Sequence, residues 1–188
     1  MHTRPTLSAA LPIAFVAACA AGASANILTN SGFENNDAWA HIFTLGDVSG
    51  YTSDEALTGS RSFLFGEAAD VINLSQAVAF VNGQDYELTF WVKNYGVDSD
   101  QLSVSLFASD APEAFVRTGI VGTGLESWEQ VTLNFSVPAA GDYYRLVFKG
   151  YDNTAAFYID DVSLTVVPAP GITGLLGIGG LISARRRR

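Results

Sequence analysis

The sequence predicts an all-β protein, built as a two-sheet antiparallel sandwich. Three observations favour this fold. Several segments alternate apolar and polar residues with the period of two that is typical of strands, turn-forming residues separate these segments every 8–16 residues, and no helical stripe extends beyond two turns. About nine or ten strands fit into one stretch of 143 residues, which is a strand density typical of a sandwich.

The expected strands can be followed along the chain. The clearest alternation lies in residues 86–93, 131–137 and 144–149, where an apolar residue recurs at every second position. Shorter β-rich runs lie at 39–45, 62–65, 71–80, 102–108, 115–121 and 157–166. Turn-forming runs separate the strands at 58–60, 81–84, 138–142 and 150–153. Each long strand therefore has one apolar face for a core and one polar face for solvent.

One domain is expected, over residues 26–166, between two targeting segments at the ends of the chain. All 19 acidic residues lie within 26–168, against five basic residues, so this part carries a net charge of −14. Such a surface repels nucleic acid and anionic lipid, which excludes both as partners. It favours solubility and offers many oxygen ligands for divalent cations.

The first 25 residues are expected to be a signal peptide. A basic start precedes an apolar run at 7–18, and a small-x-small pattern ends at Ala25, so cleavage is expected between Ala25 and Asn26. A second interpretation stays open, in which Cys19 is lipidated as in a lipoprotein. Cys19 is the only cysteine of the chain. Cleavage after Ala25 would therefore leave an exported protein without disulfides.

Residues 167–188 are expected to be a sorting tail with transient membrane association. The motif Val167-Pro168-Ala169-Pro170 precedes an uncharged run at 172–184 and four terminal Arg residues. That run has 13 residues, fewer than the roughly 20 that a stable spanning helix needs. The Arg cluster stays on the cytoplasmic side of a membrane, so the domain before it faces outward.

This tail resembles the PEP-CTERM sorting signal of exported bacterial proteins, which an exosortase-type enzyme recognises and cleaves at the Pro motif. Ala169 stands where that signal usually has Glu. The resemblance implies that signal peptidase and an exosortase both process the chain. The alternative is an ordinary C-terminal anchor with a stop-transfer cluster.

Four further segments match a second family in their order and spacing. They are 26–34 followed by Trp39, 59–62, 74–76 leading into 83–92, and 157–164. Together they resemble the jelly-roll domains of carbohydrate-binding modules of the CenC or family 4/9 type. The resemblance implies a jelly-roll sandwich with a non-catalytic role and polysaccharide as an expected partner.

The resemblance also implies a structural Ca²⁺ site that uses the Glu34 and Asp160 side chains and nearby main-chain oxygens. The first and last strands lie close together in such a sandwich, and carboxylates that converge there repel one another unless a cation neutralises them. Strand alternation directs Asp161 away from Asp160, so only Asp160 is expected to face the ion. The alternative is that Glu34 and Asp160 cap turns or face solvent.

A sugar-binding face needs exposed aromatic rings that stack on pyranose rings, with polar groups beside them. The candidates lie on outward strand positions or nearby loops and are Trp91, Tyr95, Asn134, Tyr143 and Arg145. For each aromatic residue the alternative is packing within the sandwich.

No catalytic role is expected. Residues 26–168 hold one histidine, His41, and no Gly-x-Ser-x-Gly nucleophile motif. Among 19 acidic residues some pair meets any carboxylate separation, so their abundance does not indicate a glycosidase. We therefore expect an exported, non-catalytic surface or extracellular-matrix protein that binds polysaccharide. The alternatives are a purely structural matrix or adhesion protein without a glycan ligand and, less favoured, a glycoside-acting hydrolase.

Overall fold

The computed structural model describes residues 24–42, 48–66, 71–94, 101–121, 127–151 and 157–168. These residues form ten strands: β1 (Ala40–Ile42), β2 (Gly50–Thr52), β3 (Ser62–Phe65), β4 (Ile72–Ala77), β5 (Asp85–Asn94), β6 (Gln101–Ala108), β7 (Ala114–Val121), β8 (Glu129–Ser136), β9 (Tyr143–Tyr151) and β10 (Phe157–Val166). They make two antiparallel five-stranded sheets, so the predicted all-β jelly-roll sandwich is confirmed.

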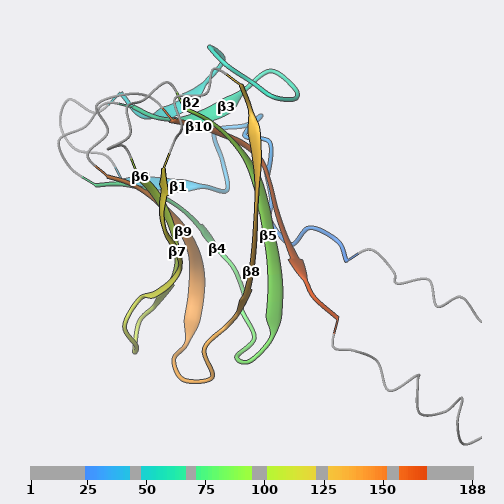
Figure 1. The fold of residues 1–188 in the computed structure, drawn as a ribbon, viewed down its shortest axis with the longest axis vertical. Coiled ribbons are helices and arrows are strands. Elements are labelled where there is room, and N and C mark those ends of the chain that lie inside the picture. The colour runs from blue at the N-terminus through green and yellow to red at the C-terminus, as the bar shows by residue number, and fades with distance from the viewer. Residues whose placement is uncertain are drawn as a thin grey trace, which may run out of the picture.

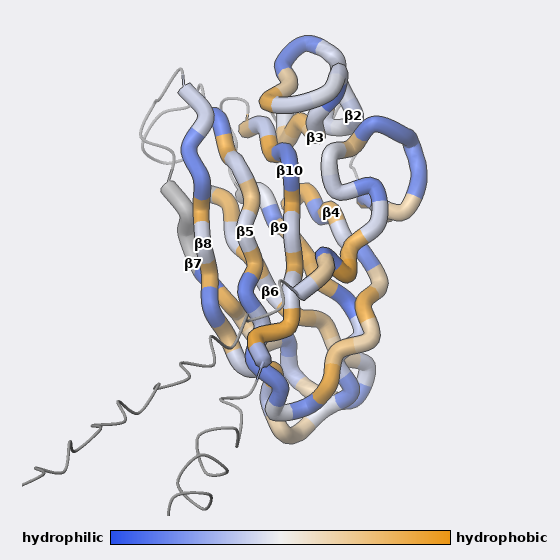
Figure 2. Tube along the Cα trace, turned by 90° about the vertical axis from the view of Figure 1, so that its right-hand side faces the viewer, coloured by the Kyte–Doolittle hydropathy of each residue, from blue (hydrophilic) through white to orange (hydrophobic). Residues whose placement is uncertain are grey.

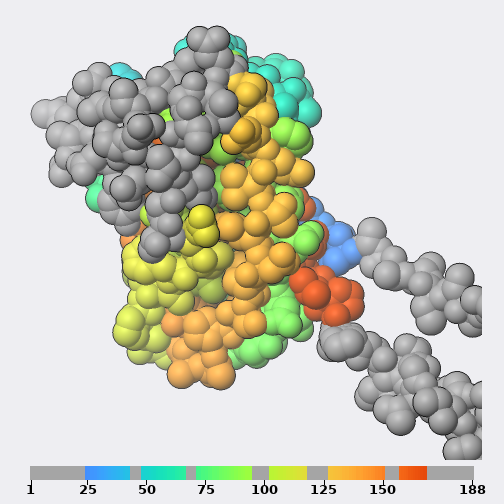
Figure 3. All heavy atoms as spheres, in the orientation of Figure 1, coloured from blue at the N-terminus to red at the C-terminus, as the bar shows by residue number. Residues whose placement is uncertain are grey.

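The two sheets pack face to face. Sheet A has the strand order β1-β4-β9-β6-β7 and lies on the left of Figure 1, and sheet B has the order β2-β3-β10-β5-β8. In the space-filling view, the side chains of the edge strands β7 and β8 cover the front of the sandwich (Figure 3). Most strand neighbours are distant in sequence, as is typical of jelly-roll connections.

Strand alternation supplies the core. Tyr86, Leu88 and Phe90 of β5 are buried, whereas the residues between them are half-buried on the opposite face. The same alternation appears as orange and blue segments along β5 and β8 in Figure 2. Across the sandwich, the rings of Phe90 and Phe148 meet edge to face, with centroids 5.1 Å apart. The short strand β2 was not predicted, because three residues are too few to show a period.

The described ends of the chain lie side by side along β10 (Figure 1). The Asn26 side chain donates to the Val162 carbonyl at 3.0 Å and accepts from the Leu164 amide at 2.9 Å. At the other end, the Val167 amide donates to the Asp85 carbonyl at 2.9 Å. Hydrogen bonds to the strands of the sandwich therefore reach Asn26 and Val167, which adjoin the two predicted cleavage sites.

The remainder of the predicted signal peptide and sorting tail, including Ala169 and Pro170, lies outside the described residues. Within the ranges that the structure describes, no helix has the length and apolar character needed to cross a membrane.

Candidate functional site

The outer face of sheet A carries a groove of about 400 Å³, within the range of roughly 300–1,000 Å³ that is common for ligand pockets. Its described lining residues come from four of the five strands and are Ile42, Asn73, Ser75, Phe107, Arg145, Val147 and Lys149. A site on hydrogen-bonded strands is held more rigidly than one built on loops.

Small side chains create the hollow. Strand register places Val147 of β9 between Ser75 of β4 and Ser105 of β6. Val147 and Ser105 are 5% and 0% exposed, so they form a low floor. Larger side chains rise at the two sides, where Ile42 on β1 is 67% exposed and Phe107 on β6 is 43% exposed. The groove therefore runs over the small residues of the central strands.

Exposed aromatic rings gather beside this floor. Phe107, Phe115 and Tyr144 are 43%, 51% and 36% exposed. Phe107 and Tyr144 contact each other edge to face, with centroids 5.8 Å apart. Phe115 lies opposite Ser105 in the register and projects from the same side of the sheet. Large rings are normally buried, so a cluster left open to solvent indicates a binding surface.

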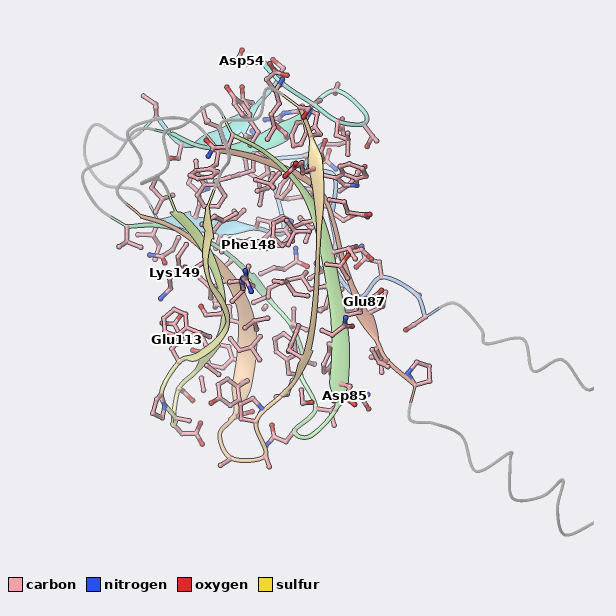
Figure 4. The ribbon with its side chains drawn as sticks, viewed as in Figure 1. Asp54, Asp85, Glu87, Glu113, Phe148 and Lys149 are labelled. Carbon is pink, nitrogen blue, oxygen red and sulfur yellow. The ribbon has the colours of Figure 1, made fainter. Side chains whose placement is uncertain are left out.

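Two cations of β9 project from the same face. Arg145 Nη1 donates to Ser75 Oγ at 3.1 Å, and its guanidinium carbon lies 5.9 Å from the centroid of the Tyr144 ring. Lys149 Nζ lies 2.6 Å from Glu113 Oε2, and Glu113 also accepts from Ser105 Oγ. Figure 4 shows Glu113 and Lys149 on the outer, left-hand side of sheet A and Phe148 between the sheets. Strand alternation produces this separation.

The predicted sugar-binding residues do not form one face. Arg145 lines the groove, whereas Trp91 and Asn134 lie on the outer face of sheet B, half-buried and exposed respectively. Tyr95 lies outside the described residues. The groove residues Phe107 and Lys149 were not selected, although both occupy outward positions in strands that the sequence predicted. The sequence does not show which strands are neighbours in a sheet, and this order is what brings Phe107 and Lys149 together.

Tyr143 does not belong to any sugar-binding face, which corrects the prediction. Its ring is 5% exposed within the core, and its hydroxyl donates to the Pro112 carbonyl at 3.2 Å. Tyr143 and Arg145 are both candidates for that face, and regular alternation would place two residues that are two positions apart on the same side of the sheet. A register shift pairs Tyr143 with Ala108 and Arg145 with Phe107, so the two residues point to opposite sides of the sheet.

The outer face of sheet B is partly covered by the β2–β3 loop, residues 53–61. The Leu57 and Thr58 amides donate to Asp160 Oδ2 at 2.9 and 3.2 Å. Glu55 Oε2 of the same loop lies 2.9 Å from Lys93 Nζ on β5. Asp160 is therefore 0% exposed, although it projects from the outer side of β10.

Glu34 holds the same loop from its other end. Its carboxylate accepts from the Ser60 amide at 3.0 Å, from Ser60 Oγ at 2.7 Å and from the Arg61 amide at 3.2 Å. The Ser60 donors lower the pKa of Glu34. For Asp160, burial raises the pKa and outweighs the opposing effect of the Leu57 amide. Both residues that are predicted to bind calcium thus accept hydrogen bonds from this loop.

Asp161 faces the same loop as Asp160, so the prediction that it points away is wrong. The Thr58 hydroxyl donates to Asp161 Oδ1 at 2.8 Å. A Cβ built on Gly32 would lie 3.4 Å from Asp161 Oδ1 and 3.8 Å from Asp160 Oδ1, so both carboxylates approach this glycine. Asp161 has φ 47° at a register shift, and this bulge breaks the alternation of the strand.

Metal-ligating side chains do not form a large cluster in the described part of the chain. No group of three or more His, Cys, Asp or Glu side chains lies close enough there to hold a metal ion. A cation at this position would therefore depend on main-chain and water oxygens in addition to the carboxylates, a ligand set that Ca²⁺ accepts.

No protein-family model matches the chain, and no curated protein sequence matches it. Solved structures resemble it in fold. TmCBM61 in complex with β-1,4-galactotriose has a TM-score of 0.58 and 19% identity, over 77% of this chain and 100% of that chain. The CBM22-1 xylan-binding domain from Paenibacillus barcinonensis Xyn10C has a TM-score of 0.57 and 18% identity, over 74% of this chain and 93% of that chain.

A third similar structure comes from a larger protein. The enzymatically active domain of tailspike protein 4 of bacteriophage CBA120 has a TM-score of 0.57 and 19% identity, over 76% of this chain. The chain spans 21% of that tailspike chain. At these identities the likeness shows a shared fold, and carbohydrate-binding modules are prominent among the proteins that share it.

Proposed function

We propose that this chain is an exported, non-catalytic surface or extracellular-matrix protein whose jelly-roll domain binds a polysaccharide along the groove of sheet A. The observation that carries the proposal is the groove itself, with a small-residue floor beside the exposed rings of Phe107, Phe115 and Tyr144. Apolar ring faces stack on the C–H faces of sugars, and Asn73 and Arg145 supply donors for hydroxyl groups.

Binding without cleavage agrees with the charges around the groove. None of its described lining residues is acidic. The carboxylate of Glu113 borders the groove and is engaged with Lys149 and Ser105. Hydrolysis of a glycosidic bond commonly uses two carboxylates on either side of the bond. The described part of the groove therefore favours a binding role.

Export and sorting form the second part of the proposal. Cleavage between Ala25 and Asn26 would leave Asn26 as the first residue, where its side chain bonds to β10. Cleavage by an exosortase-type enzyme at Val167-Pro168-Ala169-Pro170 would follow directly on the end of the sandwich. Expression in a host that has the sorting machinery, followed by intact-mass measurement, tests both cleavages. A lipidated Cys19 and a retained Arg tail would contradict both.

Calcium at Glu34 and Asp160 is the third part. A buried carboxylate at Asp160 whose pKa is raised by burial, with the charge of Asp161 adding to the rise, is an electrostatic setting that a cation would stabilise. Such an ion would secure the β2–β3 loop, outside the groove of sheet A.

Glycan binding is tested by measuring the affinity of the folded domain for immobilised polysaccharides, including xylan, β-1,4-galactan and polygalacturonate. Phe107→Ala should lower the affinity about tenfold or more, since aromatic anchors dominate such sites. Trp91→Ala is the matched control on sheet B and should bind like the wild type. A folded wild-type domain that binds no glycan would favour the purely structural alternative, and a loss confined to Trp91→Ala would move the site to sheet B.

A further inference from the structure

We propose that the groove of sheet A selects polysaccharides that carry carboxylate groups, the uronic-acid class, through Arg145. This inference rests on the proposed function, because it names the ligand class of the same groove.

The groove is a basic exception on an acidic molecule. Residues 26–168 hold 19 acidic and five basic residues, yet two of those five, Arg145 and Lys149, line this groove. No described lining residue is acidic. A neutral sugar needs no such concentration of cations, because amides, hydroxyls and carboxylates also bind hydroxyl groups. An acidic polymer needs a local group of cations to bind, since the rest of the protein surface repels negative charge.

The two groove cations differ in what neutralises them. Lys149 forms an ion pair with Glu113 at 2.6 Å. Among the described residues, Arg145 forms no ion pair with a carboxylate, and its one hydrogen bond goes to the hydroxyl of Ser75. The positive charge of the described groove is therefore concentrated at Arg145.

The contacts of Arg145 orient its guanidinium for a ligand. The bond from Nη1 to Ser75 Oγ fixes one edge of the planar group at 3.1 Å, and the Tyr144 ring lies 5.9 Å from its central carbon. Contacts with the described residues use one of its five N–H donors, and the other four are not engaged by them. A planar guanidinium matches a planar carboxylate in a two-bond geometry, which an ammonium group does not offer.

Sugar stacking and carboxylate binding can occur together in this arrangement. Phe107 lies directly opposite Arg145 in the register of β6 and β9, and its ring contacts Tyr144. A sugar ring on Phe107 would therefore place a ring substituent within reach of Arg145. A uronic acid carries its carboxylate as such a substituent.

The test compares polymers that carry a carboxylate, its uncharged methyl ester or a sulfate group. Affinity of the full domain is measured for oligogalacturonate, for the same oligomer fully methyl-esterified, and for a sulfated galactan. We expect at least tenfold tighter binding of oligogalacturonate than of its methyl ester, and weaker binding of the sulfated polymer. Arg145→Gln should remove this preference, because a charge-assisted hydrogen-bond pair is lost.

Arg61→Gln is the matched control. It removes the same charge from the end of the β2–β3 loop, where Arg61 lies over the Tyr51 ring, and should leave the preference intact. Equal affinity for the acid and its ester, or equal loss in both variants, would overturn the carboxylate assignment while glycan binding stands. Preference for the sulfated polymer would also overturn it. Absence of binding to every polymer, neutral or acidic, would instead overturn the proposed function.

Discussion

The two outer faces of this sandwich obey the same strand alternation, yet they are different surfaces. The face of sheet A is open, has small residues along its centre and carries Arg145 and Lys149. The face of sheet B is partly covered by the β2–β3 loop, which places the fully buried carboxylate of Asp160 beneath loop amides. Alternation decides which side chains point outward, but a loop decides whether they reach solvent.

The largest effect is expected from breaking the loop contact on sheet B. Asp160→Ala leaves the amides of Leu57, Thr58 and Asp161 without their acceptor. The free energy of unfolding should fall by about 2–3 kcal/mol, because donors to a charged acceptor are lost in a buried place. Denaturant unfolding measures this loss. Glycan affinity at sheet A should stay unchanged in the folded fraction, and a parallel loss of affinity would show that the two faces are coupled.

Calcium removal should have the next largest effect and should also be confined to sheet B. We expect EDTA to lower the melting temperature by several degrees and excess Ca²⁺ to restore it, since a bound ion stabilises the folded state. Glu34→Gln should weaken this response. A melting temperature that EDTA leaves unchanged would remove the proposed ion and leave Glu34 and Asp160 as loop caps.

A smaller effect is expected from changing the charge of the groove on sheet A. Glu113→Gln removes the carboxylate that pairs with Lys149 and exposes a second positive charge. Oligogalacturonate should then bind a few-fold more tightly, because partly buried charges attract an anion more strongly than exposed ones. Binding isotherms at two salt concentrations measure the change. Weaker binding would mean that the Glu113–Lys149 pair shapes the groove and does not limit its charge.

The smallest effect is a dependence of stability on acid pH through Glu34. The pKa of Glu34 is lowered in the folded state, chiefly by Ser60, so its contribution to stability is present above its ordinary value of 4.5 and is lost as pH falls below it. Asp160 has a raised pKa and the opposite sign. Melting curves from pH 6 to about 3 should show less acid destabilisation in Glu34→Gln than in the wild type. Identical curves would exclude a role for Glu34 in acid sensitivity.

Much of the fold could be predicted because strand alternation is local. The segments 62–65 and 157–166 coincide with β3 and β10, and the other long strands differ from their predicted bounds by a few residues. The errors arose where the period is interrupted. The register shift beside Asp161 reverses the side to which this residue points, and the shift between Arg145 and Tyr143 leaves Tyr143 in the core. A bulge leaves no signal in the alternation.

The candidate site was less predictable, because it depends on neighbours. Arg145 was selected from its strand, but its partner Ser75 lies 70 residues earlier in the chain. Trp91 was selected as an outward aromatic residue, and it lies on the opposite sheet. A single strand shows which of its residues are aromatic and which point outward. Whether two such residues line the same groove depends on the order of the strands in the sheet.

The amino-acid sequence by itself determined the strands, the apolar core and the acidic charge, because these follow from each residue and its nearest neighbours. Tertiary structure decided that Ser75, Val147 and Ser105 meet in one floor and that a loop closes over Asp160. The physical reason is that a sheet pairs segments distant in sequence. Its surface is therefore shaped by contacts that no single segment contains.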